Sequence, residues 1–234
     1  MTSTENRVAY AEDGLAIEAE IYTATGAASA LWMSETSAIV CPRSLTRRAG
    51  FAEAARQSKD RGWPVYLRRS GGGAVPEGPG VLNVALGMTQ ARGFTIEAGY
   101  RMLSDVIRAA LGQDGDRLES GDTTGSFCDG AWNLMVGGRK VAGLAQQLRP
   151  LPDEKLRILA HAMILVDGDV VEGAGAVDRL HKDLGLPTIR ADTHTTLEKS
   201  LNRTDGWTDF AGDLLAAAQE ALATHARSGI CRSA

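Results

Sequence analysis

Residues 68–75 read Arg68-Arg69-Ser70-Gly71-Gly72-Gly73-Ala74-Val75, and the rest of the chain is best interpreted outward from this stretch. Glycine lacks a Cβ, so its main chain can approach a ligand closely, and successive free N–H groups form a concave, positive site for phosphate or carboxylate oxygens. The two arginines add fixed charge and paired donors. The stretch predicts an anion-binding turn, although by itself it fits a plain glycine-rich turn after a strand equally well.

The segments before this turn predict an α+β arrangement. Strands are indicated at residues 31–32 and 37–40, a helix over 47–61 that stops at Gly62 and Pro64, and a strand over 65–67 that leads into the turn. Nearer the N-terminus, Leu15, Ile17, Ala19 and Ile21 alternate with other residues at a period of two, which favours a half-buried strand.

The segments after the turn predict further strands and helices. A strand over 81–86 is followed by apolar residues at helical spacing from Ile96 to Leu111, with Thr95 as N-cap and Gly112 as stop signal. Two hairpins are predicted, one over 132–142 with a Gly137-Gly138 turn and one over 158–171 with an Asp167-Gly168 turn. Helices are expected over 195–201 and 207–223. The pattern predicts a mixed, largely antiparallel sheet flanked by helices.

Composition limits the classes of function. The chain has 234 residues, a net charge of −4, 44% hydrophobic and 23% charged residues, so we expect a single soluble domain over 1–234, no nucleic-acid partner and no membrane association. No apolar run is long enough to span a bilayer and the first residues are polar, unlike a signal peptide. Three widely spaced cysteines, Cys41, Cys128 and Cys231, predict no disulfide framework, and the expected compartment is the cytoplasm.

A second motif lies downstream of the glycine turn. The predicted hairpin carries Gly138-Arg139-Lys140-Val141-Ala142-Gly143-Leu144-Ala145-Gln146, and Cys128 comes shortly before it. The order and spacing of the two motifs resemble the lipoate-protein ligase and octanoyltransferase family, whose members carry Arg-Arg-Ser-Gly-Gly-Gly-Ala-Val and then Gly-Arg-Lys-(hydrophobic)-(Ala/Ser)-Gly-x-Ala-x. The resemblance covers about residues 30–170. It implies the fold of the biotin/lipoate protein ligase catalytic domain, a class II synthetase-like mixed sheet that binds a medium-chain acyl group.

The resemblance also implies roles for residues. Lys140 falls at the family's lysine that contacts the acyl carbonyl and phosphate, a compact charge suited to the negative charge that develops as an amine attacks. The implied substrate or adenylate contacts are Arg68, Arg69, Ser70, Gly71, Gly72, Gly73, Ala74, Val75, Asn83, Gly143, Ala145 and His161. The motifs name no metal ligands.

Cys128 leaves the reaction open. The stretch Ser126-Phe127-Cys128-Asp129-Gly130-Ala131-Trp132 resembles the segment in which one acyltransferase branch holds a cysteine that forms a thioester with octanoate. Asp129 would disfavour a thiolate if its side chain pointed inward. A lone cysteine is also commonly an inert buried residue.

The leading hypothesis is therefore an ATP-dependent lipoate-protein ligase. It would use ATP and Mg²⁺ to make an acyl-adenylate from lipoate or octanoate, and would then modify one lysine of a lipoyl-domain protein of the 2-oxoacid dehydrogenase E2 or glycine cleavage H protein type. The intact triple glycine favours this reaction. The chain ends before the C-terminal accessory domain that many ligases carry, which implies that such a domain is absent or supplied by a separate subunit.

Two alternatives follow from the same residues. The first is an ATP-independent octanoyl or lipoyl transferase that uses a Cys128 thioester. The second is a non-catalytic binder of lipoate or lipoyl domains, suggested by Pro76-Glu77-Gly78 where many ligases have a His-Asp pair and by Asn133 where an aspartate is common.

Overall fold

The computed structural model describes residues 2–203 and 206–230, and its centre is a seven-stranded sheet. Neighbouring strands of this sheet are antiparallel except for its first pair, which is parallel. In spatial order the strands are β1 (Thr2–Val8), β2 (Ala28–Ser34), β6 (Val81–Ala91), β10 (Lys155–Leu165), β9 (Arg139–Leu151), β8 (Asn133–Val136) and β7 (Glu119–Gly121). The predicted α+β class with a mixed, largely antiparallel sheet is confirmed.

A smaller sheet holds the beginning and end of the glycine turn. Its order is β4 (Val65–Arg68), β3 (Ala38–Pro42) and β5 (Val75–Glu77), with β4 parallel and β5 antiparallel to β3. The turn over residues 69–74 thus connects the two outer strands of this sheet. It begins at Arg68, which lies opposite Pro42 in the register.

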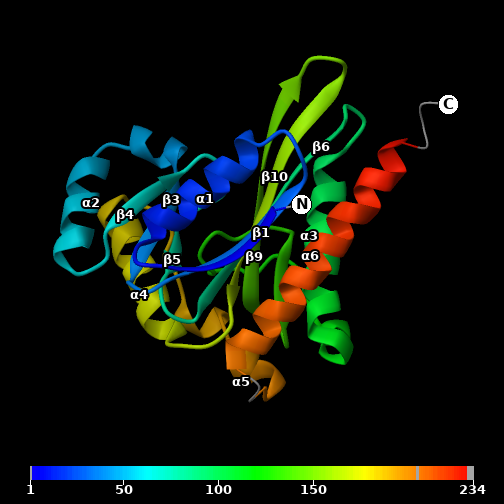
Figure 1. Ribbon diagram of the computed structural model, residues 1–234. Coiled ribbons are helices and arrows are strands. Elements are labelled where there is room, and N and C mark those ends of the chain that lie inside the picture. Colours follow the sequence, from blue (N-terminus) through cyan, green and yellow to red (C-terminus); the bar gives the residue numbers. More distant parts are fainter. Residues whose placement is uncertain (1, 204–205, 231–234) are drawn as a thin grey trace.

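Helices cover both faces of the large sheet. On one face α3 (Ile96–Leu111) and α6 (Gly206–Ile230) pack on Leu31, Val84 and Ile158, whereas α1 (Ala11–Thr23) packs on Ala30, Ala85 and Leu159. Because adjacent strand residues point to opposite faces, α1 must lie across the sheet from α3 and α6. Figure 1 shows these helices on the two sides of the central strands.

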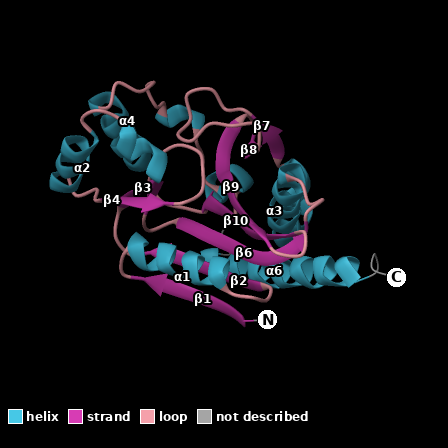
Figure 2. Ribbon diagram, turned by 90° about the horizontal axis from the view of Figure 1, so that it is seen from above, coloured by secondary structure: helices cyan, strands magenta, loops and turns pink. Residues whose placement is uncertain are grey.

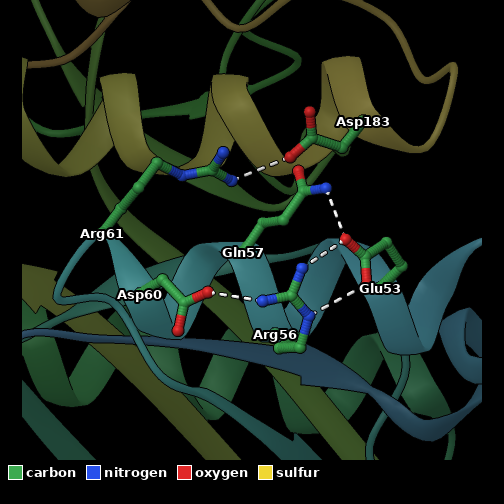
Figure 3. A network of polar contacts seen from close by, with 6 residues as sticks. All are labelled: Glu53, Arg56, Gln57, Asp60, Arg61 and Asp183. Carbon is green, nitrogen blue, oxygen red and sulfur yellow. Dashed lines mark hydrogen bonds and ion pairs between the residues drawn. The ribbon is translucent and has the colours of Figure 1, made fainter.

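The small sheet has its own helical cover. Figure 2 shows α2 (Phe51–Asp60) and α4 (Val170–Asp183) beside β3 and β4, away from α3 and α6. Arg61 at the end of α2 donates to Asp183 of α4 at 2.8 Å, next to a surface network in which Arg56 contacts Glu53 and Asp60 (Figure 3). A short helix, α5 (Leu197–Leu201), precedes α6.

The predicted strand over residues 15–21 is wrong, because this segment belongs to α1. The buried side of the helix consists of residues three or four apart, namely Ala11, Gly14, Glu18, Ile21 and Tyr22. The alternation of apolar residues concealed this helical spacing. Asp13 accepts a hydrogen bond from the Tyr10 N–H at 3.2 Å, a helix-start signal that the sequence analysis missed.

The predicted hairpin over 158–171 is also wrong in its second half. Asp169 accepts hydrogen bonds from the N–H groups of Val171 and Glu172, so it is the N-cap of α4 and no strand forms there. Strand β10 instead pairs with β9 through a turn that contains Asp153 and Glu154, both at positive φ.

Other predicted elements occur with shifted ends. The helix expected from residue 47 begins at Phe51, because Arg43–Arg47 forms a 3-10 turn. The hairpin of β8 and β9 is confirmed, with Gly137 and Gly138 at φ of 56° and 71°. The α3 helix has the predicted Thr95 cap, whose hydroxyl accepts from the Ala98 N–H at 3.1 Å. Cys231 lies outside the described residues, and among the described helices none is long and apolar enough to cross a membrane.

Candidate active site

Arg68 organises the glycine turn around its guanidinium group. It is the last residue of β4 and is almost fully buried, and Nη2 donates to the carbonyls of Gly71 and Gly73 at 2.9 and 2.7 Å. Its Nη1 donates to the Val40 carbonyl at 3.1 Å. The first arginine of the motif therefore closes the turn by binding main-chain carbonyls.

Cys128 lies against this turn from a distant part of the sequence. Its Sγ accepts a hydrogen bond from the Gly73 N–H at 2.9 Å and lies 3.8 Å from Arg68 Nη2. Cys128 has φ of 48°, a conformation that is uncommon for a residue with a side chain. A Cβ on Gly72 would lie 2.6 Å from the sulfur, and one on Gly73 would lie 3.1 Å from the Cys128 Cα. The glycines are thus required for the close approach of the thiol.

Lys140 contacts the main chain on either side of the peptide bond that leads into Cys128. It is fully buried near the start of β9, and its Nζ donates to the main-chain carbonyls of Phe127 and Cys128 at 2.7 and 2.9 Å. Burial lowers the pKa of Lys140 to about 8, while the nearby Cys128 and Asp129 oppose this shift. The ammonium group of Lys140 therefore contacts the peptide that carries the thiol.

His194 is a further member of this cluster that the sequence analysis missed. Its ring stacks on Phe127 with centroids 4.0 Å apart, and its Nε2 accepts a hydrogen bond from the Phe127 N–H at 3.2 Å. Burial lowers the pKa of His194 to about 4, so the ring is neutral at pH 7. No sequence motif marks this histidine, because its partner lies 67 positions earlier in the chain.

The carboxylate of Asp129 binds its own loop instead of the thiol. Its Oδ1 accepts from the N–H groups of Thr123 and Gly130, at 2.6 and 2.9 Å, and from the side-chain amide of Asn133 at 2.9 Å. Asn133, which replaces an aspartate common in the resembled family, is therefore bonded within the same loop. The inward-pointing Asp129 that would disfavour a thiolate is not observed.

A pocket lined by residues of both motifs opens beside Cys128. Seven residues predicted for the site line it, namely Arg68, Val75, Asn83, Cys128, Gly143, Ala145 and His161. Seven lining residues were not predicted as site residues, namely Leu15, Glu18, Trp32, Val40, Glu77, Leu144 and Met163. Leu15 and Glu18 were missed because α1 was taken for a strand.

Polar side chains in the wall of this pocket form two separate clusters. Asn83 Nδ2 donates to Glu77 Oε2 at 2.7 Å, and burial raises the pKa of Glu77 to about 8. On another side, His161 lies between the Ser70 hydroxyl at 2.7 Å and Glu18 at 3.3 Å. Glu18 also accepts a hydrogen bond from the Trp32 ring N–H at 3.1 Å. Ser70 is therefore held by a buried chain of side chains.

The remaining predicted residues lie outside the pocket. Ala74 is buried, Gly71 and Gly72 are exposed, and the exposed Arg69 lines a neighbouring groove. Arg43 also lines this groove, which shares Leu15, Glu18 and Arg68 with the pocket. In the described part of the chain, no cluster of three or more His, Cys, Asp or Glu residues is placed to hold a metal ion.

Comparisons with known proteins bear on this arrangement. The chain is 38% identical over 173 residues to an octanoyl-[GcvH]:protein N-octanoyltransferase from Kyrpidia tusciae, a match covering 71% of this chain and 60% of the relative. It is 33% identical over 143 residues to the protein of that name from Geobacillus kaustophilus, covering 58% and 50%. The chain thus spans less than two thirds of the length of these curated relatives.

A solved structure shares the fold. A bi-partite lipoate protein ligase from Thermoplasma acidophilum aligns with a TM-score of 0.68 at 15% identity, covering 94% of this chain and 83% of that chain. The model of the lipoyl protein ligase A/B catalytic domain matches residues 18–219, which include the glycine turn, Cys128 and Lys140. This chain therefore belongs to the lipoyl protein ligase A/B catalytic domain family.

Proposed function

We propose that this protein is an acyltransferase that carries an octanoyl or lipoyl group on Cys128 as a thioester and passes it to a lysine of a lipoyl-domain protein. The observation that carries the proposal is the placement of the Cys128 sulfur, which accepts a hydrogen bond from the Gly73 N–H and lies beside Arg68, while Cys128 lines the pocket. This reaction was the alternative to ATP-dependent ligation. The names of the octanoyltransferase relatives favour it over the ligase hypothesis.

The reaction consists of two displacements. Cys128 Sγ attacks the acyl carbonyl of a donor carrier, the bond from that carbonyl to the carrier breaks, and the thiol proton goes to the departing amine or thiol. The ε-amine of the acceptor lysine then attacks the Cys128 thioester, an amide forms, and a proton returns to sulfur. By analogy with the relatives' names, we propose a donor of the octanoyl-GcvH type.

The residues around the sulfur suit both steps. The Gly73 N–H and the Arg68 guanidinium stabilise negative charge, on sulfur before attack and on the acyl oxygen as the tetrahedral intermediate forms. Lys140 holds the Phe127 and Cys128 carbonyls, which keeps the strained Cys128 backbone in place. Gly143 and Ala145 leave room for the acyl chain along β9.

Intact mass after exposure to an octanoylated carrier tests the proposal. We expect an adduct of one octanoyl group, lost in Cys128→Ser and released by hydroxylamine as a thioester would be. Cys41→Ser is the matched control, since Cys41 is fully buried and does not line the pocket. An adduct that survives Cys128→Ser, or transfer to a lipoyl domain without any adduct, would contradict the proposal.

A second candidate, acyl-adenylate formation, is favoured by the groove next to the pocket. The exposed Arg69 and Arg43 both line it, and neither forms an ion pair within the described residues. Such arginines suit phosphate oxygens, and a Mg²⁺ ion arriving with a nucleotide would be held largely by those phosphates and water. Pyrophosphate release from ATP in the presence of octanoate or lipoate, lost in Arg69→Ala, would identify this reaction.

A further inference from the structure

Phe127, the residue before Cys128, is held by two side chains. It is fully buried and belongs to the loop over residues 122–132 between β7 and β8, which we call the thiol loop. Its carbonyl accepts a hydrogen bond from Lys140 Nζ at 2.7 Å, and its N–H donates to His194 Nε2 at 3.2 Å. Both polar main-chain groups of Phe127 therefore depend on side chains from distant parts of the sequence.

The segment over residues 190–195 brings His194 to the thiol loop. Its first residue donates its N–H to the Gly125 carbonyl at 2.8 Å, and its last residue donates to the Lys140 carbonyl at 3.0 Å. His194 itself forms a parallel bridge with Lys140. The segment thus connects the thiol loop to the beginning of β9, and His194 contacts both.

The hydrogen bonds of the His194 ring require its neutral form. Nε2 accepts from the Phe127 N–H, so the single proton of the ring is on Nδ1. Nδ1 lies 3.3 Å from the hydroxyl oxygen of Thr193, which donates its own proton to the Arg190 carbonyl at 2.7 Å. Burial and the nearby Lys140 ammonium lower the pKa of His194 to about 4, in agreement with a neutral ring at pH 7. The Thr193 hydroxyl therefore fixes the tautomer that accepts at Nε2.

We propose that His194 is a positioning residue for Cys128. It acts through the Phe127 N–H and keeps the sulfur at the N–H of Gly73. This inference rests on the proposed function, because it assigns a role in thioester formation at the same sulfur. Cys128 has φ of 48°, a conformation that persists only where the surroundings hold it. Lys140 holds the carbonyls of the thiol loop and His194 holds an N–H, so loss of either contact lets the backbone relax and move the sulfur away.

Two variants of His194 separate the shape of the ring from its hydrogen bond. His194→Phe keeps an aromatic ring against Phe127 and removes the acceptor, whereas His194→Gln removes the ring and supplies an oxygen that can accept. The measurement is the rate of Cys128 octanoylation by octanoyl-N-acetylcysteamine, followed by intact mass over a range of donor concentrations. The donor's carbon–sulfur bond breaks as the Cys128 thioester forms, and the released N-acetylcysteamine takes the thiol proton.

We expect the limiting rate of octanoylation to fall about tenfold in His194→Phe, the effect of one hydrogen bond, with the half-saturating donor concentration unchanged. His194→Gln should recover most of the wild-type rate. His181→Phe is the matched control, because the His181 ring contacts the Pro187 carbonyl instead of the thiol loop, and it should match wild type.

A wild-type limiting rate in folded His194→Phe would overturn the proposal, and so would an equal fall in His194→Gln. If His194→Phe does not fold, Thr193→Val at a partly exposed position serves instead, since it releases the Nδ1 proton and should lower the limiting rate about threefold. A wild-type rate there would overturn the proposal. Absence of any adduct on the wild-type chain would overturn the acyltransferase proposal as well, whereas acylation that is insensitive to His194 contradicts this inference alone.

Discussion

The two chemically important side chains, Cys128 and Lys140, meet through the main chain. Lys140 Nζ binds the Phe127 and Cys128 carbonyls and is fully buried. Its ammonium group donates a hydrogen bond to each of these two carbonyls, and no other described side chain donates to either of them. Lys140 is consequently expected to position the thiol loop and to stabilise the fold at the same time.

Lys140→Met tests this expectation. The change keeps most of the side-chain volume and leaves the buried Phe127 carbonyl and the partly buried Cys128 carbonyl without this donor, at about 1–3 kcal/mol for the buried one. We expect a lower free energy of unfolding in urea and a loss of Cys128 acylation by intact mass. Arg139→Met, a neighbouring exposed position, should change neither. Wild-type acylation in a destabilised Lys140→Met chain would limit Lys140 to a structural role.

Glu77 predicts a specific dependence of stability on pH. Burial raises its pKa from an ordinary 4.5 to about 8, so the folded chain keeps this proton where the unfolded chain loses it. Its contribution to the free energy of unfolding is fully present below pH 4.5 and is lost as the pH rises toward 8. The effect is about 1.4 kcal/mol for each pH unit in this window, and a few kcal/mol at most.

Glu77→Gln removes this titration because glutamine stays neutral. We expect the variant to gain stability relative to wild type as the pH is raised from 5 to 8, measured by urea unfolding at several pH values. Exchanging the exposed Glu35, whose side chain is far more accessible, for Gln provides the comparison. Parallel curves for wild type and Glu77→Gln would show that Glu77 ionises normally.

The turn between β4 and β5 contains three glycines with different requirements. A Cβ on Gly72 would lie 2.6 Å from the Cys128 sulfur at a φ of 98°, and one on Gly73 would lie 3.1 Å from the Cys128 Cα. A Cβ on Gly71 would meet no atom within 4 Å. The element thus needs glycine at its second and third positions and tolerates a side chain at the first.

Alanine at each position tests this difference. Gly72→Ala and Gly73→Ala should displace the thiol loop and lower the rate of Cys128 acylation by at least about tenfold, whereas Gly71→Ala should keep the wild-type rate. Stopped-flow release of the donor carrier, or timed intact mass, measures the rate. Equal rates in all three variants would mean that the turn moves freely and does not hold the sulfur.

At the scale of the whole molecule, side chains of β10 bind α1 to the sheet, and α1 forms one wall of the pocket. The buried Arg157 donates to the carbonyls of Tyr22 and Gly26 at 3.0 and 2.8 Å and to that of Ile21, at the end of α1. Four residues on, His161 contacts Glu18 on the same helix. These two contacts fix α1, which contributes Leu15 and Glu18 to the pocket.

Arg157→Met is therefore expected to affect both stability and ligand binding. It leaves the carbonyls at the helix end unpaired, at about 1–3 kcal/mol each, and it loosens the α1 wall. We expect a reduced free energy of unfolding and weaker binding of octanoic acid by calorimetry. The control is Arg101→Met, since Arg101 is exposed on α3, across the sheet from α1. Unchanged octanoate affinity would show that α1 stays in place without Arg157.

The elements and the site residues that could be predicted from the sequence are those marked by the two motifs or by a regular apolar periodicity. The glycine turn, Lys140 and Cys128 were singled out together because their motifs resemble those of a known family, and such motifs can be read from residue type and order alone. The α3 helix and the hairpin of β8 and β9 were predicted because their caps and turn glycines act within a few residues. Elements failed where local signals conflicted, as in α1, where a period of two concealed a helical face.

The polar groups of the site could not be predicted in the same way. Glu18, Glu77 and His194 owe their surroundings to partners 14 or more residues away or to burial in the folded chain, and no local pattern reports either. The sequence by itself therefore indicated the protein family, because its two motifs are continuous stretches of sequence. The fold established which acidic side chains are buried and which N–H group meets the Cys128 sulfur, because hydrogen bonds and burial depend on distances that exist only after the strands have paired.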